Sequence, residues 1–151
     1  MPGKSSETTV RLWARLTRAQ QTALASIELA LSDAGLPPLA WYDVLLETER
    51  AGDQGLRPFE LEREMLLAQY NLSRLLDRIA QAGYVERRPC KEDRRGQRIV
   101  ITDAGRAIRR KMWPVYDRAI EEAVGRFLSE PDAAALDRLL GLLTDGSRRA
   151  D

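Results

Sequence analysis

Histidine is absent from this 151-residue sequence, and cysteine occurs once, as Cys90. Without histidine the chain lacks the commonest zinc ligand, the usual general base, and the Ser-His-Asp and Cys-His nucleophile arrangements. A single cysteine excludes an internal disulfide. No phosphate loop of the G-x-x-x-x-G-K-[ST] type is present either. We therefore expect a protein that is not an enzyme and that holds no cofactor and no metal.

Long apolar runs are also missing. No stretch approaches the about 20 apolar residues that a membrane span needs, and the polar residues 1–10 lack the apolar centre of a secretory signal. We expect a cytoplasmic protein, associated with the nucleoid if it acts on DNA. Hydrophobic residues make up 44% of the chain and charged residues 31%, a balance that predicts a folded rather than a disordered protein.

The net charge of +1 conceals an uneven distribution. Residues 84–111 contain ten Lys and Arg against four Asp and Glu, a local charge of +6, so the rest of the chain carries −5. A basic segment in an otherwise slightly acidic protein is typical of a protein that binds the phosphate backbone of nucleic acid.

The spacing of apolar residues predicts a mainly helical fold with one β-hairpin. Apolar positions recur at intervals of three and four over residues 9–34, 38–51, 58–66, 69–82, 103–127 and 130–146. We expect Thr102 to cap the fifth helix, Pro114 to kink or locally break it, and Gly146 to end the sixth. The β-rich residues 84–88 and 98–102 predict two strands joined by a charged loop. The order α-α-α-α-β-β-α-α contains the core of a winged helix-turn-helix, here an α+β arrangement within a mainly α chain.

The predicted fourth helix is two-faced. Leu72, Leu75, Leu76 and Ile79 share one side and are expected to enter the core. In helix-turn-helix proteins the second helix of the motif enters the major groove, and its first residues meet base edges. Side-chain amides pair with adenine and arginine with guanine. The side chains predicted to contact bases are Gln69, Tyr70, Asn71, Ser73 and Arg74.

Four segments, taken together and in order, resemble the signature of the MarR family of winged helix-turn-helix regulators. They are residues 71–79 (NLSRLLDRI), 83–87 (GYVER), 93–95 (DRR) and 99–106 (IVITDAGR). The resemblance implies that either Arg94 or Arg95 reaches the minor groove while Asp93 orients the wing. This chain departs from the family in the turn before its fourth helix, which lacks Ser and Thr and places Tyr70 near the DNA.

The remaining basic residues suit the phosphate backbone, which sets affinity and salt dependence rather than sequence preference. Lys91 belongs to the wing tip, and the candidates for phosphate contacts are Arg78, Arg87, Arg88 and Arg98.

The resemblance also implies a homodimer. Residues 38–103 would form the winged domain, and residues 9–34 and 104–146 the dimerisation helices of a single MarR-like chain, residues 1–151. Two-fold symmetry then predicts a pseudo-palindromic double-stranded operator, and the function would be transcription regulation, as a repressor. Members of the family release DNA on binding small aromatic or phenolic effectors. Trp13, Trp41, Tyr42 and Trp113 are pocket candidates here, although aromatic residues at helical spacing more often form plain core.

Two alternatives stay open. The chain could be a winged-helix protein-interaction module without DNA binding, although that leaves the basic wing unexplained. Cys90, among several cations, could sense oxidants, but an inert thiol is the more common role for such a residue.

Overall fold

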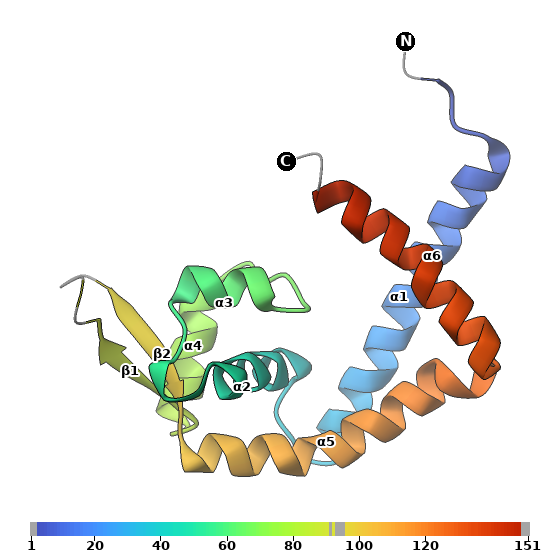
Figure 1. The fold of residues 1–151 in the computed structure, drawn as a ribbon. Coiled ribbons are helices and arrows are strands. Elements are labelled where there is room, and N and C mark those ends of the chain that lie inside the picture. The colour runs from blue at the N-terminus through green and yellow to red at the C-terminus, as the bar shows by residue number, and fades with distance from the viewer. Residues whose placement is uncertain (1–2, 91, 93–95, 149–151) are drawn as a thin grey trace. The chain divides into compact units, whose positions relative to one another are not determined.

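The computed structural model describes residues 3–90, 92 and 96–148 and divides the chain into two compact units (Figure 1). One unit spans residues 28–116, and the other combines residues 1–27 with 117–151. The helices and strands, in chain order, are α1 (Glu7–Asp33), α2 (Leu39–Ala51), α3 (Pro58–Glu64), α4 (Leu72–Gln81), β1 (Val85–Pro89), β2 (Gln97–Ile101), α5 (Asp103–Ala123) and α6 (Glu130–Arg148), with short 3-10 turns η1 (Gly52–Gln54) and η2 (Gly125–Phe127). This order confirms the predicted winged helix-turn-helix fold.

The core of the 28–116 unit lies where α2, α3 and α4 meet the hairpin. Aliphatic side chains from all five elements fill it: Val44, Leu45, Leu61, Leu75, Leu76, Ile79, Val85, Ile99 and Ile101. Full burial of one such side chain contributes about 1.5–3 kcal/mol. Because α4 supplies three of these residues, its orientation is set by the core, and the opposite face of the helix is left for other contacts.

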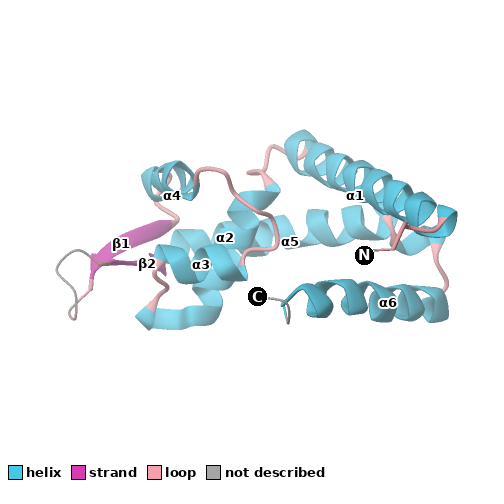
Figure 2. Ribbon diagram, turned by 90° about the horizontal axis from the view of Figure 1, so that it is seen from above, coloured by secondary structure: helices cyan, strands magenta, loops and turns pink. Residues whose placement is uncertain are grey.

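The two strands form an antiparallel pair in which Val85 faces Ile101 and Pro89 faces Gln97 (Figure 2). A third segment that the sequence did not predict joins their edge. Leu56 exchanges two backbone hydrogen bonds with Ile99, at 3.0 and 2.7 Å. This bridge pairs with the edge of β2, and η1 also contacts the strand. Ile99, Val100 and Ile101 are all buried although successive strand residues point to opposite faces.

The hairpin is tied to α4 at the chain reversal after that helix. Gly83 adopts a φ of 83°, a left-handed conformation typical of a residue that follows a helix. The Thr102 hydroxyl donates to the Gly83 carbonyl at 2.6 Å and accepts from the Gly105 amide at 3.0 Å. Thr102 therefore caps α5, as the sequence predicts. Its hydroxyl also joins the end of β2 to the turn that follows α4.

Gly105 is a close-approach glycine, and replacing it with alanine should destabilise the protein. A Cβ atom there would lie 2.1 Å from the Tyr84 carbonyl oxygen. Alanine normally favours a helix over glycine by about 1 kcal/mol, but overpacking of this kind costs about 1–3 kcal/mol or more. We expect Gly105→Ala to lower the midpoint of thermal unfolding. Gly146→Ala in α6 is the matched control, because nothing lies within 4 Å of the added carbon. It should leave the thermal midpoint unchanged or raise it. Equal midpoints would contradict the packing argument.

Several predicted boundaries were wrong. The fourth helix begins at Leu72 rather than near residue 69, because Asn71 caps it. The fifth continues through Pro114 and ends at Ala123, and the sixth continues past Gly146 to Arg148. On the third helix, Phe59 is 54% exposed, whereas Leu61 is fully buried in the core.

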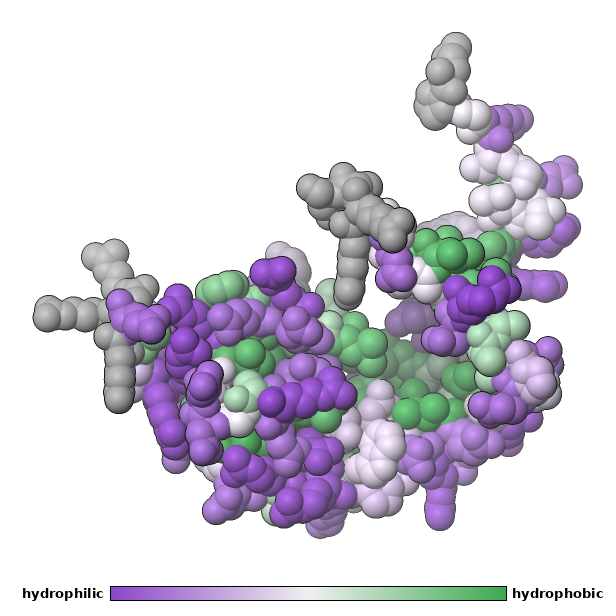
Figure 3. All heavy atoms as spheres, viewed as in Figure 1, coloured by the Kyte–Doolittle hydropathy of each residue, from purple (hydrophilic) through white to green (hydrophobic). Residues whose placement is uncertain are grey.

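The other unit exposes much of its apolar surface (Figure 3). On α1, Val10, Leu12 and Trp13 are 55–67% exposed, and on α6 Leu142 is 65% exposed. Leu136, Leu139 and Leu143 are 42–51% exposed. Exposed apolar side chains that recur on two helices are typical of a surface that binds another protein chain. No helix within the described residues is long and apolar enough to cross a membrane.

Candidate nucleic-acid interface

Helix α4 presents a polar face outward and buries an apolar one. Leu75, Leu76 and Ile79 are at most 9% exposed. On the opposite side lie the exposed side chains Asn71, Ser73, Arg74, Asp77 and Arg78. The predicted separation of the two faces is confirmed, and it leaves a row of hydrogen-bonding groups available to an external partner.

The first turn of α4 is fixed by its own cap. The Asn71 side-chain oxygen accepts a hydrogen bond from the Arg74 amide at 3.1 Å. This contact satisfies one of the free N–H groups at the helix start and leaves the Asn71 NH2 group as a donor. Gln69 and Tyr70 lie in the preceding turn rather than in the helix, and Tyr70 is fully exposed.

Arg87 connects β1 to α4. Its guanidinium donates to the Asp77 carboxylate, to the Ser73 carbonyl at 3.4 Å and to the Gln97 side chain at 3.2 Å. The sequence analysis grouped Arg87 with the phosphate contacts. In the structure this arginine instead joins the polar face of α4 to both strands of the wing. The pairing joins residues ten apart in different elements, and no spacing rule indicates it.

The other three predicted phosphate-binding arginines lie on α4 and on the two strands of the wing. Arg78 is exposed in the last turn of α4. Arg88 and Arg98 face each other across the hairpin register. Arg88 forms an exposed ion pair with Glu86 at 3.2 Å, a contact that adds about 0–1 kcal/mol to stability and is easily exchanged for a phosphate.

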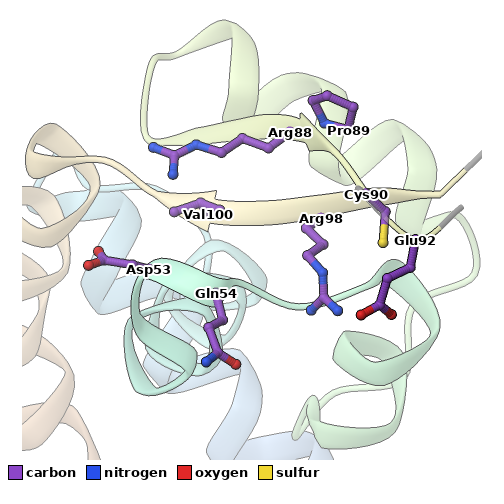
Figure 4. Close-up of a pocket in the computed structure, with 8 residues that line it drawn as sticks. All are labelled: Asp53, Gln54, Arg88, Pro89, Cys90, Glu92, Arg98 and Val100. Atoms are coloured by element: carbon purple, nitrogen blue, oxygen red, sulfur yellow. The ribbon is translucent and has the colours of Figure 1, made fainter. Parts of the chain in front are cut away.

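Arg98 points into a cleft beside the hairpin (Figure 4). The cleft has a volume of about 560 Å³, and Glu92 and Gln54 line it near the guanidinium. Asp53 lines another part of its wall. Acidic and basic groups therefore share the lining of this cleft.

Lys91, Asp93, Arg94 and Arg95, the predicted wing-tip residues, lie outside the described residues. The base of the tip is defined by the Cys90 amide, which donates to the Gly96 carbonyl at 2.8 Å. Cys90 itself is 6% exposed, and its sulfur accepts a hydrogen bond from Arg57 at 3.3 Å.

The four aromatic residues predicted to line an effector pocket do not all lie together. Tyr42 stacks with Trp113 at 6.1 Å between ring centroids, and Tyr116 packs edge-on against Tyr42 at 5.0 Å. Trp41 instead contacts Tyr84 at 6.1 Å. Trp13 belongs to the other unit and is 67% exposed. The structure thus brings Tyr42 and Trp113 together but not Trp41.

Arg109 borders this aromatic cluster. It forms an ion pair with Glu49 and donates a hydrogen bond to the Tyr42 hydroxyl at 3.3 Å.

Among the described residues, no three His, Cys, Asp or Glu side chains lie close enough together to hold a metal ion.

Comparison with known proteins identifies relatives of the interface region. The family model described as "MarR family" matches residues 34–96. The multiple antibiotic resistance protein MarR of Escherichia coli K12 is 29% identical over 85 residues, which are 56% of this chain and 59% of that protein. The chain thus spans less than two thirds of the curated relatives that it matches, between 39% and 59% of their length.

Solved structures share the fold over nearly the whole chain. Sco3205, a MarR family transcriptional regulator from Streptomyces coelicolor solved in complex with DNA, superposes with a TM-score of 0.86 at 23% identity, covering 97% of this chain and 91% of Sco3205. A mutant MarR from Escherichia coli complexed with operator DNA gives a TM-score of 0.78 at 24% identity, covering 93% of this chain and 99% of that one.

Proposed function

We propose that the chain is a transcriptional regulator of the MarR family, whose model matches residues 34–96, and that it binds a pseudo-palindromic DNA operator as a homodimer and represses transcription. The observation that carries this proposal is the two-faced α4. Its buried side fixes the helix in the core, and its exposed side presents Asn71, Ser73 and Arg74 together. That arrangement suits the major groove, where side chains distinguish base pairs by their donor and acceptor patterns.

The wing extends the contact from the bases to the backbone. Arg87 fixes the hairpin to α4 through Asp77 and Ser73, so the helix and the wing approach DNA as one body. Arg78, Arg88 and Arg98 neutralise phosphates, and Arg94 or Arg95 at the tip enters the minor groove. Each phosphate contact releases counterions, so affinity falls steeply as salt rises.

Dimerisation supplies the second half-site. We assign it to residues 9–34 and 104–146, with residues 38–103 as the winged domain. The exposed leucines of α6 and the exposed Trp13 of α1 support this assignment because they leave apolar area that a second copy would bury. A dimer covering an operator within a promoter blocks polymerase, which accounts for repression and places the protein with the chromosome in the cytoplasm.

A small aromatic effector would act at the Tyr42–Trp113 stack. Tyr42 is buried, whereas Trp113 is 44% exposed, so an aromatic ligand can reach one face of the pair. Ligand-induced quenching of tryptophan fluorescence, with matching loss of DNA affinity, would support this role.

Selection of bound sequences from random double-stranded DNA, followed by gel-shift titration at rising salt, tests the proposed function. We expect enrichment of a two-fold symmetric site and a linear fall of log affinity with log salt. If no sequence is enriched, or if DNA affinity does not change with salt concentration, the proposal is wrong. A protein-interaction module then becomes the better account.

Arg74→Ala should lower affinity for the selected site by about 10- to 100-fold per half-site, because one good bidentate arginine–guanine pair contributes about 1–3 kcal/mol of discrimination. Binding to random DNA should change much less. Arg118→Ala, an exposed arginine of α5 in the other unit, is the charge-matched control. Equal losses in both variants would show that only net charge matters.

A further inference from the structure

Asp43 is a buried carboxylate in the middle of the apolar face of α2. It is 6% exposed and stands next to Val44 and Leu45, which are fully buried. Among the described residues, no lysine or arginine forms an ion pair with it. A charge without a counter-ion in such a place costs free energy, and an aliphatic residue would pack there more favourably.

The carboxylate instead holds the turn of the helix-turn-helix. Its Oδ2 atom accepts a hydrogen bond from the Leu67 amide at 3.0 Å, and the adjacent Leu66 amide also favours the charged form of the carboxylate. Residues 65–71 connect α3 to α4, and they include Tyr70 and the capping residue Asn71. A hydrogen bond from an N–H group to a carboxylate is charge-assisted and roughly twice as strong as a neutral one.

Burial raises the pKa of Asp43, and the two backbone amides only partly offset this effect. A raised folded-state pKa means that the associated stability is present below the ordinary carboxyl pKa of 3.8 and is lost as the pH rises through the folded-state value. Ionisation of Asp43 therefore lowers the stability of the fold. Burial raises the pKa of Tyr116 on α5, and the negative charge of the nearby Asp43 carboxylate raises it further.

We propose that Asp43 is a positioning residue for DNA recognition: its carboxylate, hydrogen-bonded to the Leu67 amide, fixes the turn that sets where α4 begins. This inference rests on the proposed function and adds a determinant that touches no DNA. Asn71 and Tyr70 follow the anchored amides by only a few residues, so release of the turn displaces the groups that meet the bases. Phosphate contacts from the wing do not depend on this turn and remain.

The test compares Asp43→Leu, which removes both acceptors, with Asp43→Asn, which retains one oxygen. Thr48→Val is the matched control, because Thr48 is equally buried on α2 but its hydroxyl donates only to the Val44 and Leu45 carbonyls of the same helix. Hydrogen exchange of the free protein is measured at the Leu66 and Leu67 amides. Affinity is then measured for the selected operator and for random DNA.

For Asp43→Leu we expect exchange at the two amides to accelerate at least 10-fold and the ratio of specific to random DNA affinity to fall at least 10-fold. The salt slope and the thermal midpoint at pH 7 should not decrease. Asp43→Asn should give an exchange rate and an affinity ratio between those of Asp43→Leu and the wild type. If Asp43→Leu does not fold, Asp43→Asn alone tests the proposal. Thr48→Val should keep the wild-type ratio.

Unchanged exchange at Leu66 and Leu67 in the Asp43 variants would overturn the anchoring role, whatever the DNA result. Accelerated exchange with an unchanged affinity ratio would overturn the role in recognition. If the wild-type protein itself selects no DNA, the proposed function fails first, and the exchange measurement still decides whether Asp43 fixes the turn.

Discussion

Asn71→Asp should leave the fold intact while it lowers operator affinity by about 10- to 100-fold per half-site. Aspartate caps a helix as well as asparagine does, and its negative charge suits the helix N-terminus. The bond to the Arg74 amide, now at 3.1 Å, therefore survives. The NH2 donor is lost, however, and a carboxylate then faces adenine N7 and the nearby phosphates, where it is repelled.

Asn71→Ala separates the two roles of this residue. It removes the cap as well as the donor, so the thermal midpoint should fall by the equivalent of about 1 kcal/mol. Calorimetry and gel shift on both variants check the pair. If Asn71→Asp binds the operator as tightly as the wild type, the N-terminus of α4 does not face the bases.

Leu139→Glu should convert the proposed dimer into monomers and reduce affinity for the proposed symmetric operator by more than 100-fold. Leu139 lies on α6 and is 49% exposed in the single chain. In a two-fold interface each substitution occurs twice, so two unpaired carboxylates would enter an apolar contact, at a cost of several kcal/mol. A monomer then contacts only one half-site and loses the gain from linked binding.

Sedimentation velocity and gel shift measure these effects. Arg138→Glu, the exposed neighbour of Leu139 on the same helix, is the control and should remain a dimer with near wild-type affinity. A dimeric Leu139→Glu protein, or a monomer that binds the full operator normally, would show that α6 does not hold the two copies together.

Local patterns predicted the elements that position the interface. The spacing of Leu75, Leu76 and Ile79 is sufficient to orient α4, because a helix must bury its apolar side. Likewise, Thr102 before Asp103 predicts a capped helix, and in the structure the Thr102 hydroxyl accepts the capping hydrogen bond from the Gly105 amide. The order and spacing of four short segments also indicated a resemblance to the MarR family, whose model matches residues 34–96.

Contacts between distant segments could not be predicted in this way. The Glu28 carboxylate accepts the Leu39 amide, so α2 is capped from α1 rather than by its own N-cap residue Pro38. Arg87 reaches Asp77 only because β1 returns alongside α4. Asp43 did carry a signal, since a carboxylate between apolar neighbours is anomalous, but its partners in residues 65–71 become visible only in three dimensions.

Dimethyl sulfate protection of the selected operator tests the central claim most directly, because the reagent methylates guanine N7 in the major groove and adenine N3 in the minor groove. We expect two symmetric clusters of protected guanines, centred about 10–10.5 base pairs or a multiple apart, each with protected adenines at its flank. One cluster alone, or saturated binding that leaves every guanine N7 reactive, would contradict a dimer that places α4 in the major groove twice.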